Sequence, residues 1–140
     1  AHDLDFIISL IDWDANVNPY LRQTHFLPGK VSETSDVHED KWVIYGHSRG
    51  EDVFSAKQLT LQPGAKVTLR DNGACGVLAV QGRGLIGKHH VETPTYSRFG
   101  EVTYDEFFVT YEVARSGYTV ENTGRDPLVL LRHFGPDCQS

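Results

Sequence analysis

The sequence predicts an all-β domain built as a sandwich or barrel, and three observations support this class. Short runs of apolar, β-branched and aromatic residues recur from Trp42 onward. Turn residues such as Pro63-Gly64 and Asp71-Asn72-Gly73 interrupt these runs at spacings of about 8–12 residues, which is typical of sandwiches and barrels. The 140-residue length fits one domain, because globular domains most often hold about 100–150 residues.

One short N-terminal helix is expected before the strands. Apolar residues recur there at the i, i+3, i+4, i+7 spacing of a helix face: Leu4, Ile7, Ile8 and Ile11. Asp3 can cap the start, and the helix is expected over residues 4–13. Residues 21–40 are polar and contain Pro28 and Gly29, so we expect an irregular arm. The predicted organisation is a single domain over 1–140, with helix and arm over 1–41 and a β-barrel over 42–136.

The remaining segments predict strands separated by turns. The expected strands are 42–45, 54–61, 67–69, 77–80, 95–99, 107–113, 118–121 and 128–134. Residues 81–84 are expected to form a turn. Asn122-Thr123-Gly124 predicts a tight turn that tolerates positive φ, and Pro127 fixes the entry to the last strand. This turn is expected to join two neighbouring antiparallel strands.

Composition excludes several classes of partner. The formal net charge is −6 and the 13 Lys and Arg residues are scattered, whereas nucleic-acid binding needs clustered cations. The sequence has no apolar run near the ~20 residues needed to cross a bilayer, and its start does not resemble a signal peptide. The two cysteines, Cys75 and Cys138, are too few for a disulfide framework. We therefore expect a cytoplasmic protein with reduced thiols that binds neither nucleic acid nor membrane.

Two stretches carry a family resemblance. Residues 61–64 read Leu-Gln-Pro-Gly and precede an apolar run that ends in Gly82-Arg83-Gly84, while residues 121–128 read Glu-Asn-Thr-Gly-Arg-Asp-Pro-Leu. These stretches resemble the first and second motifs of the cupin superfamily, over about residues 54–134. The resemblance implies a double-stranded β-helix, or jelly-roll, barrel.

The resemblance also implies a metal site, and this sequence departs from it. Cupins hold a transition metal through two histidines and a glutamate in the first motif and a histidine in the second. Here those positions fall at Arg70, Asn72, Val77 and Tyr118. None offers the imidazole, thiolate or carboxylate that such metals prefer, and a permanent Arg cation repels a metal ion. We expect no metal and no other cofactor.

Residues 2–6, 12–19 and 131–136 resemble proteins catalogued as mannose-6-phosphate isomerase-like cupins. This closer resemblance implies that the barrel binds a small ligand such as a sugar phosphate. It also implies that the chain is one domain of a two-barrel protein or pairs with a second copy as a homodimer, since exposed edge strands are templates for pairing.

Two groups of residues are candidates for the site. Arg70, Asn72 and Tyr118 occupy the former ligand positions, so they are expected to bind the substrate, with help from cations that could gather at the barrel mouth: Lys88, Arg98 and Arg115. His90 and Glu92 would share one strand face and are the candidate general bases of an isomerase. His89 lies beside them, although a solvated loop at 89–92 is the favoured interpretation.

The sequence leaves open whether the chain is an enzyme. The first hypothesis is a sugar or sugar-phosphate site, with isomerase chemistry if the protein is catalytic. The second is a non-catalytic cupin domain with a structural or dimerisation role. The third is a metalloenzyme with a displaced site at His89, His90 and Glu92. Fold alone does not distinguish these functions.

Overall fold

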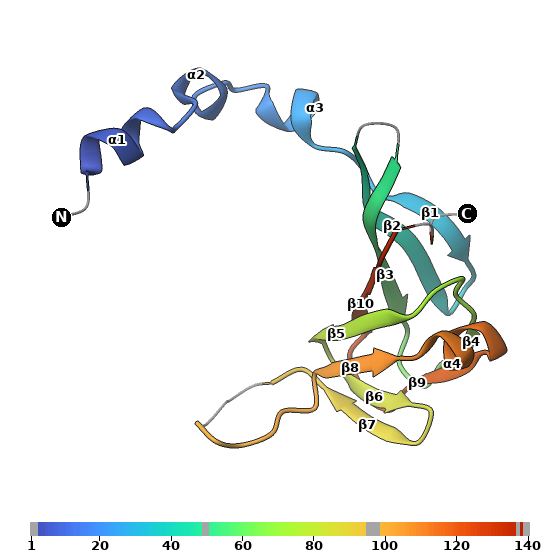
Figure 1. Ribbon diagram of the computed structural model, residues 1–140. Coiled ribbons are helices and arrows are strands. Elements are labelled where there is room, and N and C mark those ends of the chain that lie inside the picture. Colours follow the sequence, from blue (N-terminus) through green and yellow to red (C-terminus); the bar gives the residue numbers. More distant parts are fainter. Residues whose placement is uncertain (1–2, 49–50, 95–98, 137, 139–140) are drawn as a thin grey trace.

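Two antiparallel sheets form a jelly roll in the computed structural model, which describes residues 3–48, 51–94, 99–136 and 138 (Figure 1). The larger sheet has the order β1 (Lys30–Thr34), β2 (His38–Ser48), β3 (Glu51–Leu61), β10 (Leu128–Phe134), β5 (Cys75–Gln81) and β8 (Glu106–Val109). The smaller sheet has the order β4 (Lys66–Leu69), β9 (Tyr118–Asn122), β6 (Arg83–Ile86) and β7 (His89–Glu92). This architecture confirms the predicted all-β class.

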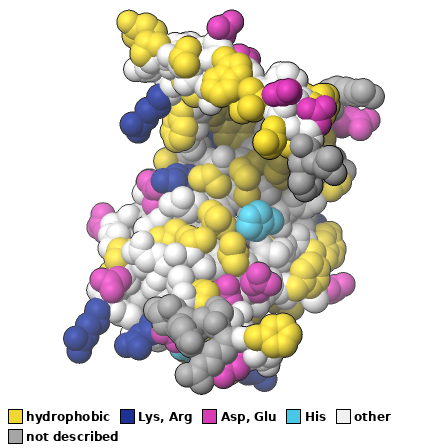
Figure 2. Space-filling model, turned by 90° about the vertical axis from the view of Figure 1, so that its left-hand side faces the viewer, with side chains coloured by type: hydrophobic (Ala, Val, Ile, Leu, Met, Phe, Trp, Pro, Cys, Tyr) yellow, Lys and Arg dark blue, Asp and Glu magenta, His cyan; other side chains and the backbone are white. Residues whose placement is uncertain are grey.

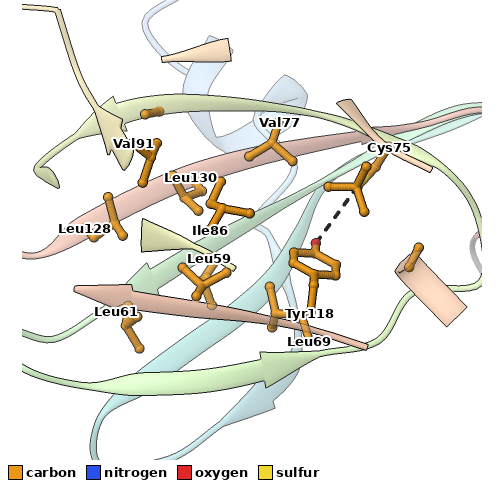
Figure 3. Close-up of a cluster of buried hydrophobic side chains, with 14 of the residues drawn as sticks. Leu59, Leu61, Leu69, Cys75, Val77, Ile86, Val91, Tyr118, Leu128 and Leu130 are labelled. Atoms are coloured by element: carbon orange, nitrogen blue, oxygen red, sulfur yellow. Dashed lines mark hydrogen bonds between the residues drawn. The ribbon is translucent and has the colours of Figure 1, made fainter. Parts of the chain in front are cut away.

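The period-two pattern of the strands places the core between the sheets. In β10, buried residues alternate with partly exposed or exposed ones, because successive side chains of a strand point to opposite faces. Strands β3, β5 and β9 contribute to the same core (Figure 3), whose largest aliphatic members are Leu59, Leu61, Leu69, Ile86, Leu128 and Leu130. Each such side chain stabilises the fold by about 1.5–3 kcal/mol when it leaves water.

The Asn122 turn connects the two sheets. Asn122 is buried, and its Nδ2 donates to the carbonyl oxygens of Leu61 and Asp126, both at 2.9 Å. Its Oδ1 accepts from the N–H of Gly124 at 2.8 Å. The turn leads from β9 in the smaller sheet to β10 in the larger sheet. The expectation that it joins two neighbouring antiparallel strands is wrong, since β9 and β10 do not pair with each other and the chain changes sheets here.

The N-terminal region has more regular structure than expected. The helix expected over residues 4–13 is divided into α1 (Leu4–Ser9) and α2 (Trp13–Asn16), because Asp12 caps a new helix by accepting from the N–H of Ala15 at 2.9 Å. The segment expected as an irregular arm contains α3 (Leu21–His25), strand β1 and the start of β2. In Figure 1, α1 and α2 extend away from the barrel.

Three further expectations need correction. Residues 83–86 and 89–92 form strands β6 and β7, where a turn and a loop were expected. The second half of the strand expected at 107–113 belongs to helix α4 (Tyr111–Ser116), which buries Ala114 completely against the core. Four residues of the strand expected at 95–99 lie outside the described residues. Within the described part of the chain, no helix is long and apolar enough to span a membrane.

The Asn122 turn generates the first testable prediction. Asn122→Ala removes both amide donors and leaves the buried carbonyl of Leu61 without its partner. An unsatisfied buried group costs about 1–3 kcal/mol, so we expect a loss of that size in the free energy of unfolding, measured by urea denaturation. Thr123→Ala, at an exposed neighbouring position, is the control and should change stability little. Equal stability of both variants would contradict this role.

Candidate functional site

The inner face of the larger sheet carries two cations side by side. Lys57 in β3 is in register with Arg132 in β10 and with Trp42 in β2, so the three residues form one row across the sheet. Arg132 is 1% exposed, although the charge of Arg is rarely buried without a partner. Lys57 Nζ lies 4.5 Å from the centre of the Trp42 ring, a favourable cation–π distance.

Two buried carboxylates neutralise this pair. Arg132 Nη1 donates to Asp71 Oδ2, and Arg132 Nη2 donates to Asp40 Oδ1 at 2.5 Å. Lys57 Nζ lies 3.5 Å from Asp40 Oδ2 and 3.8 Å from Asp71 Oδ1. The four residues, which we call the ion-pair network, contain two positive and two negative charges. Asp40 comes from β2 and Asp71 follows β4, so the network joins the larger sheet to the end of a strand of the smaller sheet.

Tyr118 and Cys75 extend the network into the core. The hydroxyl of Tyr118 donates to Asp71 Oδ2 at 3.2 Å, and the Cys75 sulfur lies 3.9 Å from the same hydroxyl (Figure 3). Burial raises the pKa of the Tyr118 hydroxyl above its ordinary value, so this group remains a neutral donor. Burial by itself would lower the pKa of Arg132, but the carboxylates of Asp40 and Asp71 outweigh burial and keep that pKa above its ordinary value.

The ion-pair network is not fully satisfied. Arg132 Nε is buried and has no hydrogen-bond partner among the described residues. Because a buried ion pair repays its desolvation cost only when the geometry and the remaining hydrogen bonds are good, this network is a poor substitute for an apolar core.

A cavity of about 580 Å³ lies beside the ion-pair network. Its mostly polar lining combines strands of the larger sheet with the segment after β4 and with helix α4: Ser32, Trp42, Lys57, Arg70, Asp71, Asn72, Arg115 and Cys138. Its lining contains three cations, Lys57, Arg70 and Arg115. The carboxylate in the lining, Asp71, is already paired with Arg132. Arg115 Nη1 donates to the Tyr111 hydroxyl at 3.1 Å and to Asn72 Oδ1 at 3.4 Å. The cavity therefore presents positive charge, and we call it the cationic cavity.

The predicted binding residues are only partly brought together. Arg70 and Asn72 are exposed and line the cationic cavity. Tyr118 is buried behind Asp71 and instead lines a more apolar cavity of about 330 Å³, which Lys88 also lines. Of the other cations expected at the mouth, Arg115 lines the cationic cavity, and Arg98 lies outside the described residues.

The candidate catalytic pair lies elsewhere. His90 Nε2 and Glu92 Oε2 are 3.0 Å apart on β7, with both side chains about half exposed. Glu92 lines a separate cavity of about 460 Å³ with Arg83 and Arg125. Neither His90 nor Glu92 lines the cationic cavity, so the structure does not bring the candidate bases to the candidate binding residues.

The residues present do not fit a cupin metal centre. The buried polar side chains near the positions where the resemblance places metal ligands are Asp71, Cys75 and Tyr118. The Asp71 carboxylate already accepts hydrogen bonds from Arg132 and Tyr118. A guanidinium in this position opposes a second cation. Across the described ranges, no three His, Cys, Asp or Glu side chains are grouped to hold a metal ion. His89, His90 and Glu92 are therefore not grouped as the displaced metal site of the third hypothesis would require.

Sequence reasoning missed the ion-pair network, although one signal pointed to it. Arg132 occupies an inward position in the alternation of β10, between Leu130 and Phe134. A charge on the apolar face of a strand needs a buried partner. The pattern does not identify Asp40 and Asp71 as those partners, because they are 92 and 61 residues away.

The network predicts a large cost for removing its central cation. Arg132→Met leaves Asp71 and Asp40 buried without their main partner, and breaking a buried pair in this way costs about 3–5 kcal/mol. We expect that loss in chemical denaturation. Arg70→Ala, which removes an exposed guanidinium, should leave stability within about 0.5 kcal/mol. A stability loss below about 1 kcal/mol for Arg132→Met would show that the network does not hold the sheets together.

The pKa of Cys75 gives a prediction at alkaline pH. Burial, with the nearby Asp71 charge, raises it from 9.0 to about 11. The folded protein therefore holds this proton more tightly than the unfolded chain. The resulting stability is complete below pH 9 and is lost as pH rises toward 11, by up to about 2–3 kcal/mol. Wild type should lose more stability than Cys75→Ala over this interval in denaturation at each pH, and parallel losses would contradict the shift.

Comparison with known proteins supports the fold. No protein-family model and no curated protein matches the sequence. Among solved structures, an RmlC-like cupin from Shewanella frigidimarina is 14% identical with a TM-score of 0.51, and the match covers 80% of this chain and 90% of that one. An RmlC-like cupin from Ralstonia eutropha is 13% identical with a TM-score of 0.51, covering 78% and 63%. Oxalate decarboxylase from Lactobacillus farciminis is 18% identical with a TM-score of 0.53, covering 78% and 31%.

The chain thus spans less than two thirds of two of these proteins. At such low identity the matches speak to architecture alone. Together with the two-sheet topology, they show that this chain has the cupin-type jelly-roll fold.

Proposed function

We propose that the barrel binds a small anionic ligand, of which a sugar phosphate is the favoured class, without a metal. The observation that carries this proposal is the excess of positive charge in the cationic cavity. Lys57 and Asp71 belong to the neutral ion-pair network, whereas Arg70 and Arg115 add two charges that no carboxylate in the lining balances. A concave site of one sign focuses its field on an oppositely charged ligand.

Arg70 is the main candidate for the anion contact. It has no hydrogen-bond or ion-pair partner among the described residues, and it lies at the edge of the cavity. Arg115 is held nearby through Tyr111 and Asn72. The planar fork of a guanidinium matches two oxygens of a phosphate, and such charge-assisted bonds are about twice as strong as neutral ones.

The rest of the lining suits the polar body of a sugar. Asn72 and Ser32 supply amide and hydroxyl groups that can bind sugar hydroxyls. The volume of about 580 Å³ falls within the ~300–1,000 Å³ of small-molecule sites. Glu92 and His90 line no part of this cavity, so the proposal contains no isomerase step and describes binding only.

A structural barrel without a ligand is the second candidate. The ion-pair network and Tyr118 fill the interior where cupins place their metal ligands, and this favours a domain that serves as a scaffold. The two candidates differ in whether the cationic cavity has an occupant.

Calorimetric titration tests the first candidate. We expect mannose 6-phosphate to bind, and mannose to bind far more weakly, because the two arginines act on the phosphate. Arg70→Ala should lower the affinity for mannose 6-phosphate about tenfold to hundredfold, which corresponds to one charge-assisted hydrogen bond of about 1.5–3 kcal/mol. The melting temperature should not change, since Arg70 is exposed.

Two controls separate the candidates. Arg22→Ala removes an exposed arginine of α3 and should leave the affinity unchanged. Inorganic phosphate distinguishes a general anion site from a sugar-phosphate site, because only the latter binds mannose 6-phosphate more tightly than phosphate. Failure of the wild type to bind either compound would favour the structural barrel.

A further inference from the structure

The cavity of about 460 Å³, which we call the outer cavity, lies on the outer surface of the barrel and shares no lining residue with the cationic cavity. Its lining includes Arg83 of β6 and Glu92 of β7, which are register partners. The next pair in that register, Gly84 and Val91, is buried, so Arg83 and Glu92 point away from the core. Figure 2 shows acidic and basic side chains together on the lower part of the molecule, the part that holds β6 and β7 in Figure 1.

Arg83 and Glu92 do not pair with each other. Directly opposite residues of antiparallel strands have Cβ atoms about 4.5–5.5 Å apart, a spacing that permits an ion pair. Instead, Glu92 Oε2 lies 3.0 Å from His90 Nε2. The stem of Arg83 lies against Gly124, since a Cβ placed on Gly124 would be 3.3 Å from Arg83 Cγ. Within the described residues, the Arg83 guanidinium has no hydrogen-bond or ion-pair partner. These two opposite charges are therefore held apart.

The connection from β9 to β10 adds a second pair of separated charges. Arg125 and Asp126 follow Gly124, are exposed and line the outer cavity. Asp126 accepts from Asn122 Nδ2 at 2.9 Å through its backbone carbonyl. In the described part of the chain, neither the Asp126 carboxylate nor the Arg125 guanidinium forms a hydrogen bond or an ion pair. The outer cavity thus contains two positive and two negative side chains, none of which neutralises another.

Backbone contacts hold the frame of the outer cavity. Gly82 has a φ of 80°, and a Cβ placed on it would lie 2.7 Å from the carbonyl oxygen of Pro127, so the β5–β6 connection packs directly on the segment before β10. The N–H of Thr93 donates to the Gly82 carbonyl oxygen at 3.0 Å. Thr93 lines the outer cavity, and its Oγ1 is buried without a partner among the described residues. Buried polar groups normally have a hydrogen-bond partner, and a polar ligand in the outer cavity can supply it.

We propose that the outer cavity binds a small zwitterion, namely a free amino acid or a dipeptide. A ligand with one charge is attracted by one pair of side chains and repelled by the other, whereas a ligand with both signs is complementary to all four. The carboxylate pairs with Arg83 and Arg125, whose planar guanidinium groups match its two oxygens. The ammonium group donates to Glu92 and Asp126. The described lining contains no aromatic side chain on which a sugar ring or a base could stack.

An NMR titration tests the proposal by location and by charge. The probes are the common amino acids and their glycyl dipeptides, each added at up to about 10 mM. We expect at least one of them to shift the backbone amide signals of Gly82, Thr93 and Gly124, while the signal of Asn72 at the cationic cavity stays in place. The N-acetyl form of that ligand lacks the ammonium group, and its carboxamide form lacks the carboxylate. Each form should bind at least about tenfold more weakly than the zwitterion.

Two variants assign each end of the ligand to its side chains. Arg83→Gln should lower the affinity for the zwitterion about tenfold and leave the affinity for the carboxamide form, which has no carboxylate to lose, nearly unchanged. Glu92→Gln should lower the affinity for the zwitterion by a similar factor and leave that for the N-acetyl form nearly unchanged. Lys66→Gln removes an exposed cation of β4 in the same sheet and is the control that should not alter binding. Because these side chains lie at the surface, the amide signals of the core should keep their wild-type positions.

Three results would overturn the zwitterion site. If no probe shifts the signals of Gly82, Thr93 and Gly124, the outer cavity takes no such ligand. If the N-acetyl or the carboxamide form binds as tightly as the zwitterion, only one charge is recognised. If both variants bind like the wild type, the ligand lies elsewhere. The probes contain no phosphate and the two cavities share no lining residue, so each of these results is independent of the proposed function.

Discussion

The burial of Arg132 is the constraint on which the interior of this protein depends. A guanidinium that is 1% exposed must keep its counter-charges in place, because an uncompensated charge in a low-dielectric interior costs several kcal/mol. Asp40 comes from the larger sheet, and Asp71 comes from the end of a strand in the smaller sheet. Their joint contact with Arg132 fixes the position of one sheet relative to the other. Tyr118, from the middle of the smaller sheet, secures Asp71 by a further hydrogen bond.

The same network shapes the electrostatics of the cationic cavity. Its own charges sum to zero, so it adds no net field of its own at longer range. The charges of the cationic cavity that no carboxylate of its lining balances belong to Arg70, which follows β4, and Arg115, which lies in α4. Both side chains are exposed. These two unbalanced charges are the physical reason to consider an anionic ligand.

Strand β5 has one face toward the core and one face away from it. Val77 faces the core and is 3% exposed, and Gly76 faces away from it, because neighbouring residues of a strand point in opposite directions. The barrel core is complete without the N-terminal helices, since α1, α2 and α3 contribute no buried side chain.

The sequence by itself determined the fold class, most of the strands and the departure from a cupin metal site. Those inferences rest on local properties: the period-two pattern of residues 128–134, the turn at Asn122, and the side-chain types at Arg70, Asn72, Val77 and Tyr118. It wrongly predicted that the strand from residue 107 continues to Val113, because β-branched and aromatic residues favour strands. Residues 111–116 form helix α4, which buries Ala114.

Only the tertiary structure decided which charges meet. His90 and Glu92 lie on one face of β7 because residues two apart in a strand share a face, but their place outside the cationic cavity depends on how the sheets pack. Arg132 meets carboxylates that precede it by 92 and 61 residues. Such pairings follow from strand register and sheet stacking, which are properties of the whole chain and have no local pattern in the sequence.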